Sequence, residues 1–193
     1  KNKKIMFDSR VQTSKLIYTK CDELKITPKT FISASAMGYY GLEEDGEKKE
    51  NDLPGNEWLS NLCVHWEKSA DKFNKLGSRV VKLRLSLILD EQQGVLKKIL
   101  FGYKFKIGII FGNGKQRFPW IYIDDVTRFI LFILRNNDIV GVFNVANTEN
   151  DSYYDVMKRI QKKKYPSSIL FFLPKWFMKF ILGEKAKLLF SNI

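Results

Sequence analysis

The chain is organised around Phe31-Ile32-Ser33-Ala34-Ser35-Ala36-Met37-Gly38-Tyr39-Tyr40-Gly41. The short apolar run at its start predicts a buried strand. The Ser-Ala-Ser end of that strand brings hydroxyls to the carboxyl edge of a sheet, where ligands bind in open α/β folds. Gly38 and Gly41 permit a sharp turn directly after the strand. A core strand followed by a plain surface turn is the alternative that these residues leave open.

Outward from this stretch, predicted helices alternate with predicted strands. The helices are expected at residues 10–24, 56–76, 95–101, 124–136, 153–164 and 175–190, and the strands at 31–36, 79–89, 117–123 and 141–146. Asp8-Ser9 and Asn56 are the expected caps of the first two helices, and Gly77 is expected to end the second. The alternation is typical of an α/β fold with a mainly parallel sheet. The apolar helical portion at the end of the chain predicts a small C-terminal lobe.

Two loops interrupt this alternation. Residues 42–55 are polar and acidic, and they are predicted to be either a substrate lid or a solvated connection. A second, glycine-punctuated loop runs from Gly108 to Gln116. Its glycine spacing is not a dinucleotide fingerprint, and it does not join a strand to a helix, so a phosphate-binding loop is excluded.

Composition narrows the class of protein. The 193 residues are 45% hydrophobic, a globular balance with enough length for one sizeable core. Cys21 and Cys63 make neither a disulfide framework nor a zinc site, so no metal is expected and a reducing cytoplasm is predicted. No apolar run is long enough to span a bilayer. The net charge of +12 favours anionic ligands, but no nucleic-acid-binding motif accompanies it and the basic residues are expected on solvated faces.

Several segments, taken in order, resemble the "epimerase family protein" branch of the extended short-chain dehydrogenase/reductases, also labelled NAD-dependent epimerase/dehydratase. They are Asp8–Val11 with Thr13, Ser33–Gly41, Leu62-Cys63 with Trp66-Glu67, Leu83-Arg84, Gly114–Gln116, Trp120–Asp125, Gly141–Asn144 and Leu182–Glu184. The resemblance implies a Rossmann-like doubly wound parallel sheet that lacks the family's N-terminal Gly-rich segment and the end of its C-terminal tail. On this basis residues 1–147 are expected to belong to the NAD(P)-binding domain and 148–193 to a partial tail domain.

The resemblance also shows a departure at the catalytic helix. Short-chain dehydrogenases use a Tyr-x-x-x-Lys pair, in which the tyrosine transfers a proton and the lysine lowers its pKa. Leu59 and Cys63 stand at these two positions, so the pair is lost, as the resemblance implies for the whole of this branch. Cys63 is interpreted as inert core, with a reactive thiol as the alternative. His65, the only histidine, is expected to lie at the surface or in helix packing.

The resemblance also indicates which other residues are candidates for catalysis. Ser35 matches the family's upstream serine, with Ser33 as the less favoured register, and Arg10 stands where the usual asparagine lies. Tyr39 or Tyr40 is hypothesised to supply the missing phenol, and the alternative is that both tyrosines pack the loop. The predicted catalytic residues are therefore Ser35, Tyr40, Tyr39 and Arg10.

The cofactor implied is NAD or NADP, although the Gly-rich binding turn is absent from this chain. Its predicted contacts are Ser33, Arg84 and Ser86, the last at a position where the family prefers glycine. Arg84 has an alternative role as the partner of Asp90 or Glu91. The predicted substrate contacts are Gln116, Arg117 and Trp120, since an indole stacks on rings and a guanidinium binds anions. Hydrophobic cover is the alternative for Trp120.

Three functions stay open at this point. The first is an NAD(P)-dependent epimerase or oxidoreductase with a small-molecule substrate, a nucleotide-linked one among the options, present here as a fragment that is inactive alone. The second is a non-catalytic module that binds a dinucleotide or a protein partner, and the third is a decayed remnant. Neither nucleic acid nor a membrane is expected as a partner, and the sequence does not identify the oligomeric state.

Overall fold

The computed structural model describes residues 2–41 and 46–176 of the chain. Contacts divide the chain into two compact units. The first unit consists of residues 1–41, 47–86 and 124–145, and the second of residues 42–46, 87–123 and 146–193.

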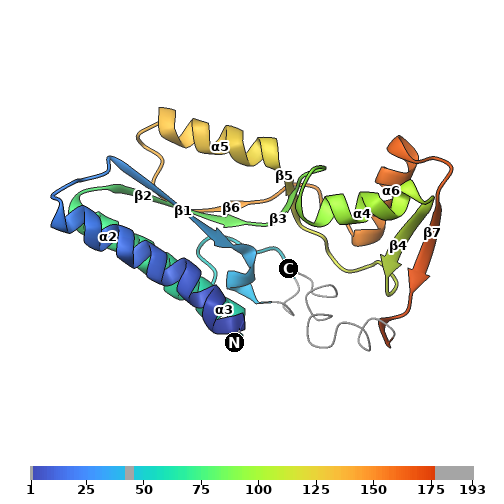
Figure 1. The fold of residues 1–193 in the computed structure, drawn as a ribbon, viewed down its shortest axis with the longest axis horizontal. Helices are drawn as coiled ribbons and strands as arrows, with labels where there is room; N and C mark the ends of the chain where they lie inside the picture. Colours follow the sequence, from blue (N-terminus) through green and yellow to red (C-terminus); the bar gives the residue numbers. More distant parts are fainter. Residues whose placement is uncertain (1, 42–45, 177–193) are drawn as a thin grey trace. The chain divides into compact units, whose positions relative to one another are not determined.

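A three-stranded parallel sheet forms the centre of the first unit. Its order is β1 (Thr30–Ala36), β2 (Arg79–Leu85) and β6 (Gly141–Val145). The long helical segment α1 (Asn2–Phe7), η1 (Asp8–Gln12) and α2 (Thr13–Glu23) precedes the sheet, and α3 (Trp58–Asp71) joins β1 to β2. Figure 1 shows α2 and α3 along one face of this sheet and α5 (Ile123–Arg135) along the other. Strands covered on both faces are typical of parallel α/β sheets.

Aromatic packing closes the α3 side of this sheet. Phe73, in the 3-10 turn η3 (Lys72–Leu76), is fully buried and stacks on Phe31 with ring centroids 3.6 Å apart. Tyr18 of α2 meets the same ring edge-on at 5.7 Å. The backbone of Gly77, with a φ of 83°, ends η3 as predicted and turns the chain into β2.

The second unit contains two short parallel ladders. β3 (Leu87–Leu89) pairs with β5 (Trp120–Tyr122), and β4 (Ile107–Phe111) pairs with β7 (Ile169–Leu173). Two helices, α4 (Gly94–Lys104) and α6 (Tyr153–Lys164), pack against β4. Their shared core is Tyr103, Ile110, Tyr153, Val156 and Met157.

The expected α/β class with parallel, Rossmann-like strands is confirmed, and so are β1, β6 and α6. The helix predicted to start after Asp8-Ser9 instead runs from Asn2, and Asp8–Gln12 is a π-helical turn within it. The cap expected at Asn56 is wrong by one residue, since Glu57 holds the cap position without a side-chain hydrogen bond. The single strand expected at 79–89 is two strands that belong to different sheets.

The remaining differences lie in the second unit. The strand expected at 117–123 is only Trp120–Tyr122, because Ile123 already begins α5. Ile107–Phe111, expected to be part of a loop, is the strand β4. A Cβ at Gly108 would lie 2.5 Å from Cζ of Tyr103 and 2.7 Å from Cδ2 of Leu170, so this glycine permits close packing within a strand. Most of the helical tail predicted at 175–190 lies outside the described residues.

Candidate active site

The turn that follows β1 is fixed by close approaches of the backbone. It is the 3-10 turn η2 (Met37–Tyr40), and Gly41 after it has a φ of 102°. The Gly55 N–H donates to the carbonyl of Tyr39 at 2.9 Å, and a Cβ at Gly55 would lie 2.7 Å from the carbonyl of Tyr40. The Ser60 hydroxyl of α3 donates to the Gly38 carbonyl at 3.0 Å. The two tyrosines of the turn are therefore held in fixed positions at the carboxyl end of β1.

Three polar residues lie in register near the carboxyl ends of the sheet. Ser35 of β1 pairs with Arg84 of β2, and Arg84 pairs with Asn144 of β6. Helix α3 contributes Glu67, and its carboxylate accepts the Ser35 hydroxyl at 2.7 Å. With Tyr40 from η2, these residues form one hydrogen-bonded group. We call Ser35, Tyr40, Glu67, Arg84 and Asn144 the edge cluster.

Arg84 and Glu67 form a buried bidentate ion pair at the centre of the edge cluster. Nε and Nη2 of Arg84 donate to the two carboxylate oxygens of Glu67 at 2.8 and 2.9 Å. The two residues are only 3% and 6% exposed. Burial disfavours the charged guanidinium, but the hydrogen bonds to Glu67 and Tyr40 and the charge of Glu67 raise the pKa of Arg84 overall. Arg84 thus pairs with Glu67, and neither Asp90 nor Glu91 is its partner.

Tyr40 is the most enclosed phenol of the site, with 2% of its surface exposed. Its hydroxyl accepts from Nη1 of Arg84 at 2.8 Å and lies 2.7 Å from Oδ1 of Asn144 and 3.0 Å from the carbonyl of Lys49. Burial raises the pKa of Tyr40, and the hydrogen bond to Arg84 offsets part of that increase. The phenol therefore stays protonated and donates to an acceptor inside the cluster.

Tyr39, the neighbouring tyrosine, has a different environment. Its ring lies against the guanidinium of Arg84, with 3.4 Å between the guanidinium carbon and the ring centroid. The ring of Tyr40 meets it edge-on at 5.2 Å. Tyr39 is partly exposed, and its hydroxyl makes no hydrogen bond within the described part of the chain. Of the two tyrosines, Tyr39 is the one whose hydroxyl is not already engaged by the cluster.

The edge cluster also holds the second half of the acidic loop. The carbonyl of Glu50 accepts from Nη1 of Arg84 at 3.0 Å, and its carboxylate accepts from the Asn144 N–H at 2.8 Å. The side-chain amide of Asn144 donates to the Lys48 carbonyl at 3.0 Å. These contacts fasten residues 48–50 to the carboxyl ends of the sheet. Residues 42–45 of the same loop lie outside the described residues.

The two positions of the lost Tyr-Lys pair are occupied by packing residues. Leu59 lies against the turn, since a Cβ at Gly38 would be 2.6 Å from its Cδ2. Cys63 is 1% exposed, and burial raises the pKa of its thiol to about 11. A protonated, enclosed thiol agrees with the interpretation of Cys63 as inert core. His65 approaches the carbonyl of Asn61 at 2.8 Å and contacts the ring of Phe7, in helix packing.

Arg10 lies in the π-helical turn η1, a local geometry that is often found at functional sites. Its guanidinium donates to the Met6 carbonyl and to the Ser9 hydroxyl, both at 3.2 Å. It also lies 5.2 Å from the ring centroid of Trp66. None of these contacts, taken among the residues the structure describes, joins Arg10 to the edge cluster.

Two serines of the predicted cofactor site show different degrees of engagement. Ser33 is buried, and its hydroxyl donates to the Ala34 carbonyl at 3.1 Å. Ser86 directly follows the carboxyl end of β2, and its backbone N–H donates to Val145 at 3.0 Å. The Ser86 hydroxyl is buried and has no hydrogen-bond partner among the described residues. Ser78, just before the amino end of β2, also has a buried hydroxyl without a partner there.

The predicted substrate residues belong to the second unit. Gln116 is buried, and its amide donates to the Phe111 carbonyl at 3.2 Å. Nη1 of Arg117 donates to the Gly46 carbonyl at 3.1 Å. The indole of Trp120 donates to the Asp151 carboxylate at 3.1 Å, and that carboxylate also accepts from Arg159 at 2.7 Å. Asp151 thus fixes the orientation of the Trp120 ring.

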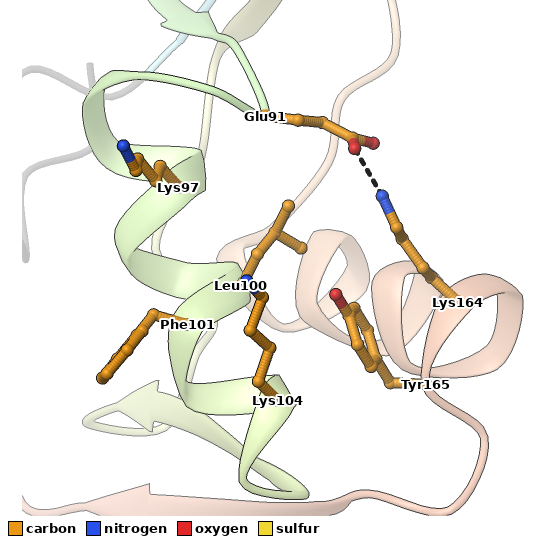
Figure 2. A pocket seen from close by; sticks show the side chains of 7 residues that line it. All are labelled: Glu91, Lys97, Leu100, Phe101, Lys104, Lys164 and Tyr165. Atoms are coloured by element: carbon orange, nitrogen blue, oxygen red, sulfur yellow. Dashed lines mark hydrogen bonds and ion pairs between the residues drawn. The ribbon is translucent and has the colours of Figure 1, made fainter.

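Two hollows in the second unit lie between α4 and α6. Figure 2 shows the first, of about 240 Å³, with the ion pair of Glu91 and Lys164 beside Leu100 and Tyr165. The second, of about 230 Å³, is lined largely by apolar side chains and includes Trp120. Both volumes are below the usual range of small-molecule pockets. Trp120 is the one predicted site residue that lines either hollow.

The predicted site residues include Ser35, Arg84 and both tyrosines. No site role was predicted for Glu67, Glu50 or Asn144. A signal for Glu67 was present in the spacing of the helix. Glu67 follows Cys63 by four residues, and both therefore lie on the apolar face of α3 that packs on the sheet. A carboxylate on a buried face needs a partner. Neither residues 2–41 nor residues 46–176 contain a cluster of His, Cys, Asp and Glu suited to a metal ion, or a helix able to cross a membrane.

Comparison with known proteins supports the class defined by this fold. Residues 67–146, which include Glu67, Arg84 and Asn144, match the model of the NAD dependent epimerase/dehydratase family. Epimerase family protein ML0860 of Mycobacterium leprae is 31% identical over 182 residues, which are 93% of this chain and 57% of that protein. Epimerase family protein SH2119 of Staphylococcus haemolyticus is 31% identical over 95% of this chain and 62% of its own length.

A solved structure agrees with these relatives. The crystal structure of human epimerase family protein SDR39U1 with NADPH matches with a TM-score of 0.85 and 23% identity. The match covers 96% of this chain and 63% of that one. The resemblance to the epimerase family proteins is therefore confirmed. The chain spans about three fifths of the length of the curated relatives it matches.

Proposed function

We propose that this chain forms the substrate-side part of an NAD(P)-dependent epimerase or oxidoreductase. It would work together with a cofactor-binding segment that precedes it, since its curated relatives are longer than this chain. The observation that carries the proposal is the buried, unpartnered hydroxyl of Ser86 at the carboxyl end of β2. Buried polar groups are normally hydrogen-bonded, and a buried hydroxyl without a partner is a candidate for a hydrogen bond to a ligand. Carboxyl ends of parallel strands are where α/β sheets bind ligands.

The fit of a dinucleotide to the predicted residues is uneven. The hydroxyl of Ser86 offers an unused donor and acceptor, and Ser33 lies on the adjacent strand. Arg84 fits a different role, because its donors already meet Glu67, Tyr40 and Glu50. The human neighbour was crystallised with NADPH, and UDP-glucuronic acid 4-epimerase from Bacillus cereus was crystallised with NAD. A bound nicotinamide would supply hydride transfer, and the phenol of Tyr39 or Tyr40 would move the hydroxyl proton of the substrate.

The substrate class we propose is a nucleotide-linked alcohol. The Bacillus cereus neighbour, with a TM-score of 0.69, is named for a UDP-linked sugar. In this chain the ring of Trp120 is partly exposed, lines a hollow and is held in place by Asp151. An oriented aromatic ring of this kind is suited to stacking on a base or sugar. Arg117 is the cation proposed to meet the phosphate groups, and Gln116 frames the loop between β4 and β5.

The test is a titration with NADPH and NADH of two proteins, the 193-residue chain and the reading frame extended upstream to the length of its relatives. The extended protein is expected to bind one dinucleotide, and the isolated chain to bind weakly or not at all. In the extended protein Ser86→Ala should weaken binding about 5- to 10-fold, the worth of one hydrogen bond. Ser78→Ala, the matched buried serine at the other end of β2, should leave affinity unchanged. Failure of the extended protein to bind either dinucleotide would overturn the proposal.

A second candidate function is a dinucleotide-binding module without catalysis. The contacts of Leu59 and the buried thiol of Cys63 favour it, since packing residues have replaced both members of the usual catalytic pair. The two candidates differ in turnover. If the extended protein binds NADPH but does not exchange its hydride with nucleotide sugars, the binding module is the better description.

A further inference from the structure

We propose that Glu67 and Arg84 are positioning residues whose ion pair presents Tyr39, rather than Tyr40, to the ligand. This inference rests on the proposed function, because it selects between the two phenols of that site. It also gives Arg84 a role other than binding the cofactor. Glu67 acquires a role beyond that of a buried carboxylate with a partner.

Arg84 uses most of its hydrogen-bonding capacity on neighbouring residues. A guanidinium has five N–H donors in one plane. Four hydrogen bonds leave Arg84: two to Glu67, one to Tyr40 and one to the carbonyl of Glu50. One flat face of the guanidinium is covered by the ring of Tyr39. Four of the five donors are thus used within the protein and the residue is only 3% exposed, so the side chain is built to hold its neighbours.

The two tyrosines differ in whether their hydroxyls are hydrogen-bonded within the cluster. The hydroxyl of Tyr40 is enclosed between Arg84, Asn144 and the backbone of Lys49. Tyr39 contributes only its ring to the cluster, and its partly exposed phenol keeps its full hydrogen-bonding capacity among the described residues. A group that exchanges a proton with a substrate must come within hydrogen-bonding distance of it. Tyr39 meets that requirement without any rearrangement of the cluster.

The ion pair of Glu67 and Arg84 is better suited to fixing a geometry than to adding stability. Buried ion pairs are poor sources of stability compared with apolar residues of equal size, and fixing a single geometry is a better-supported use. The bidentate contact fixes the plane of the Arg84 guanidinium, and the Tyr39 ring lies against that guanidinium. The pair also engages Ser35, so one carboxylate orients the serine and the arginine together. A cation beside a phenol is thereby restored in a chain that lacks the usual lysine.

The first experiment is nitration of the folded 193-residue chain with tetranitromethane, with the products mapped by peptide mass spectrometry. Tyr39 is expected to react at least about tenfold faster than Tyr40, since an enclosed phenol reacts only when the structure opens locally. In Glu67→Gln, which keeps the size of the side chain but removes its charge, this difference should fall severalfold. Glu23→Gln, at an exposed pair with Lys20, is the matched control and should leave it unchanged. Equal nitration of Tyr39 and Tyr40 in the unaltered chain would overturn the inference without any variant.

The second experiment separates positioning from structure in the upstream-extended protein. Saturating NADPH should slow nitration of Tyr39 but not of Tyr18, which packs on Phe73 away from the cluster. In Glu67→Gln the affinity for NADPH should change less than about threefold while protection of Tyr39 is lost, and Glu67→Asp should restore part of it. Retained protection in Glu67→Gln would assign the pair a purely structural role. Absence of binding to both NADPH and NADH would instead remove the proposed function, and the nitration contrast of the shorter chain would still decide the role of the pair.

Discussion

The edge cluster brings five polar side chains together, four of them buried and Asn144 partly buried, whereas the hollows between α4 and α6 are lined by apolar side chains and lysines. In the first region each cluster side chain has a hydrogen-bond partner within the described structure, at distances of 2.7 to 3.0 Å. In the second, the lining residues include the apolar side chains of Leu96, Leu100 and Ile160 and the lysines Lys97, Lys104, Lys163 and Lys164. Both regions bring together segments that are distant in the sequence.

The two regions differ in which substitutions of their side chains they tolerate. A bidentate ion pair tolerates neither a shift nor a neutral partner, because a buried charge without its counterion is strongly unfavourable. An apolar lining tolerates changes that keep volume. The first region is therefore restricted to one arrangement of its side chains, whereas the apolar side chains of the second can change as long as their volume is kept. Substitutions in each region test this difference.

The largest expected effect is that of Glu67→Ala. Removing the carboxylate leaves the Arg84 guanidinium buried and unpaired, and the free energy of unfolding should fall by about 3–5 kcal/mol. Urea denaturation followed by far-UV circular dichroism measures this loss. The double variant Glu67→Leu with Arg84→Met should recover much of it, because both charges are gone. Equal losses in the single and double variants would show that the ion pair is not the organising contact.

Second in size is the contrast between the two tyrosines. Tyr40→Phe removes a hydroxyl that serves Arg84 and Asn144, and leaving such buried groups short of a partner should cost about 2–3 kcal/mol. Tyr39→Phe removes a hydroxyl without a partner in the described structure, so its effect should stay below about 0.5 kcal/mol. The same denaturation experiment applied to both variants provides the comparison. A similar loss in both would contradict the assignment of Tyr40 as the structural phenol.

The sequence predicted the first region better than the second. The strand ending in Ser35, the turn with two tyrosines and the strand ending near Arg84 were all recognisable, because apolar runs and glycines report directly on local structure. The partners of these residues were not recognisable. Glu67 and Asn144 are joined to Ser35 and Arg84 through strand register and through the packing of α3, and neither is encoded locally.

In the second unit even local structure was misjudged, for a physical reason. Strand β4 contains Gly108, and glycine in a strand usually signals a turn or a bulge when only the sequence is read. The reason for this glycine is the ring of Tyr103, which approaches within the space a Cβ would need. Likewise, one continuous apolar run became β2 and β3 in separate sheets, because burial by two different cores gives the same composition.

Third in size is Gly108→Ala, which tests how tightly the second unit is packed. Its Cβ would lie 2.5 Å from the Tyr103 ring, and overpacking of this kind should cost about 1–2 kcal/mol. The measurement is a double-mutant cycle with Tyr103→Leu, read from urea denaturation. If the cost arises from the ring, Gly108→Ala should be less destabilising in the Tyr103→Leu background. Equal costs in both backgrounds would indicate that another neighbour, such as Leu170, sets the limit.

The smallest expected effect concerns the thiol of Cys63, beside the edge cluster, and it depends on pH. Burial raises its pKa from the ordinary value of 9.0 to about 11. A folded-state pKa above the unfolded value means that the contribution to stability is fully present below pH 9 and is lost as the pH rises towards 11. By linkage the loss between pH 8 and pH 10 should be about 1 kcal/mol.

Cys63→Ala isolates this contribution, because lysines and tyrosines titrate in the same range in both proteins. The unaltered chain should therefore lose about 1 kcal/mol more than Cys63→Ala between these two pH values, as measured by urea denaturation at each. Parallel losses in the two proteins would mean that the thiolate is tolerated in the folded chain. In that case Cys63 would be accessible to solvent or to a cation, and the reactive thiol, rather than inert core, would become the better interpretation of this residue.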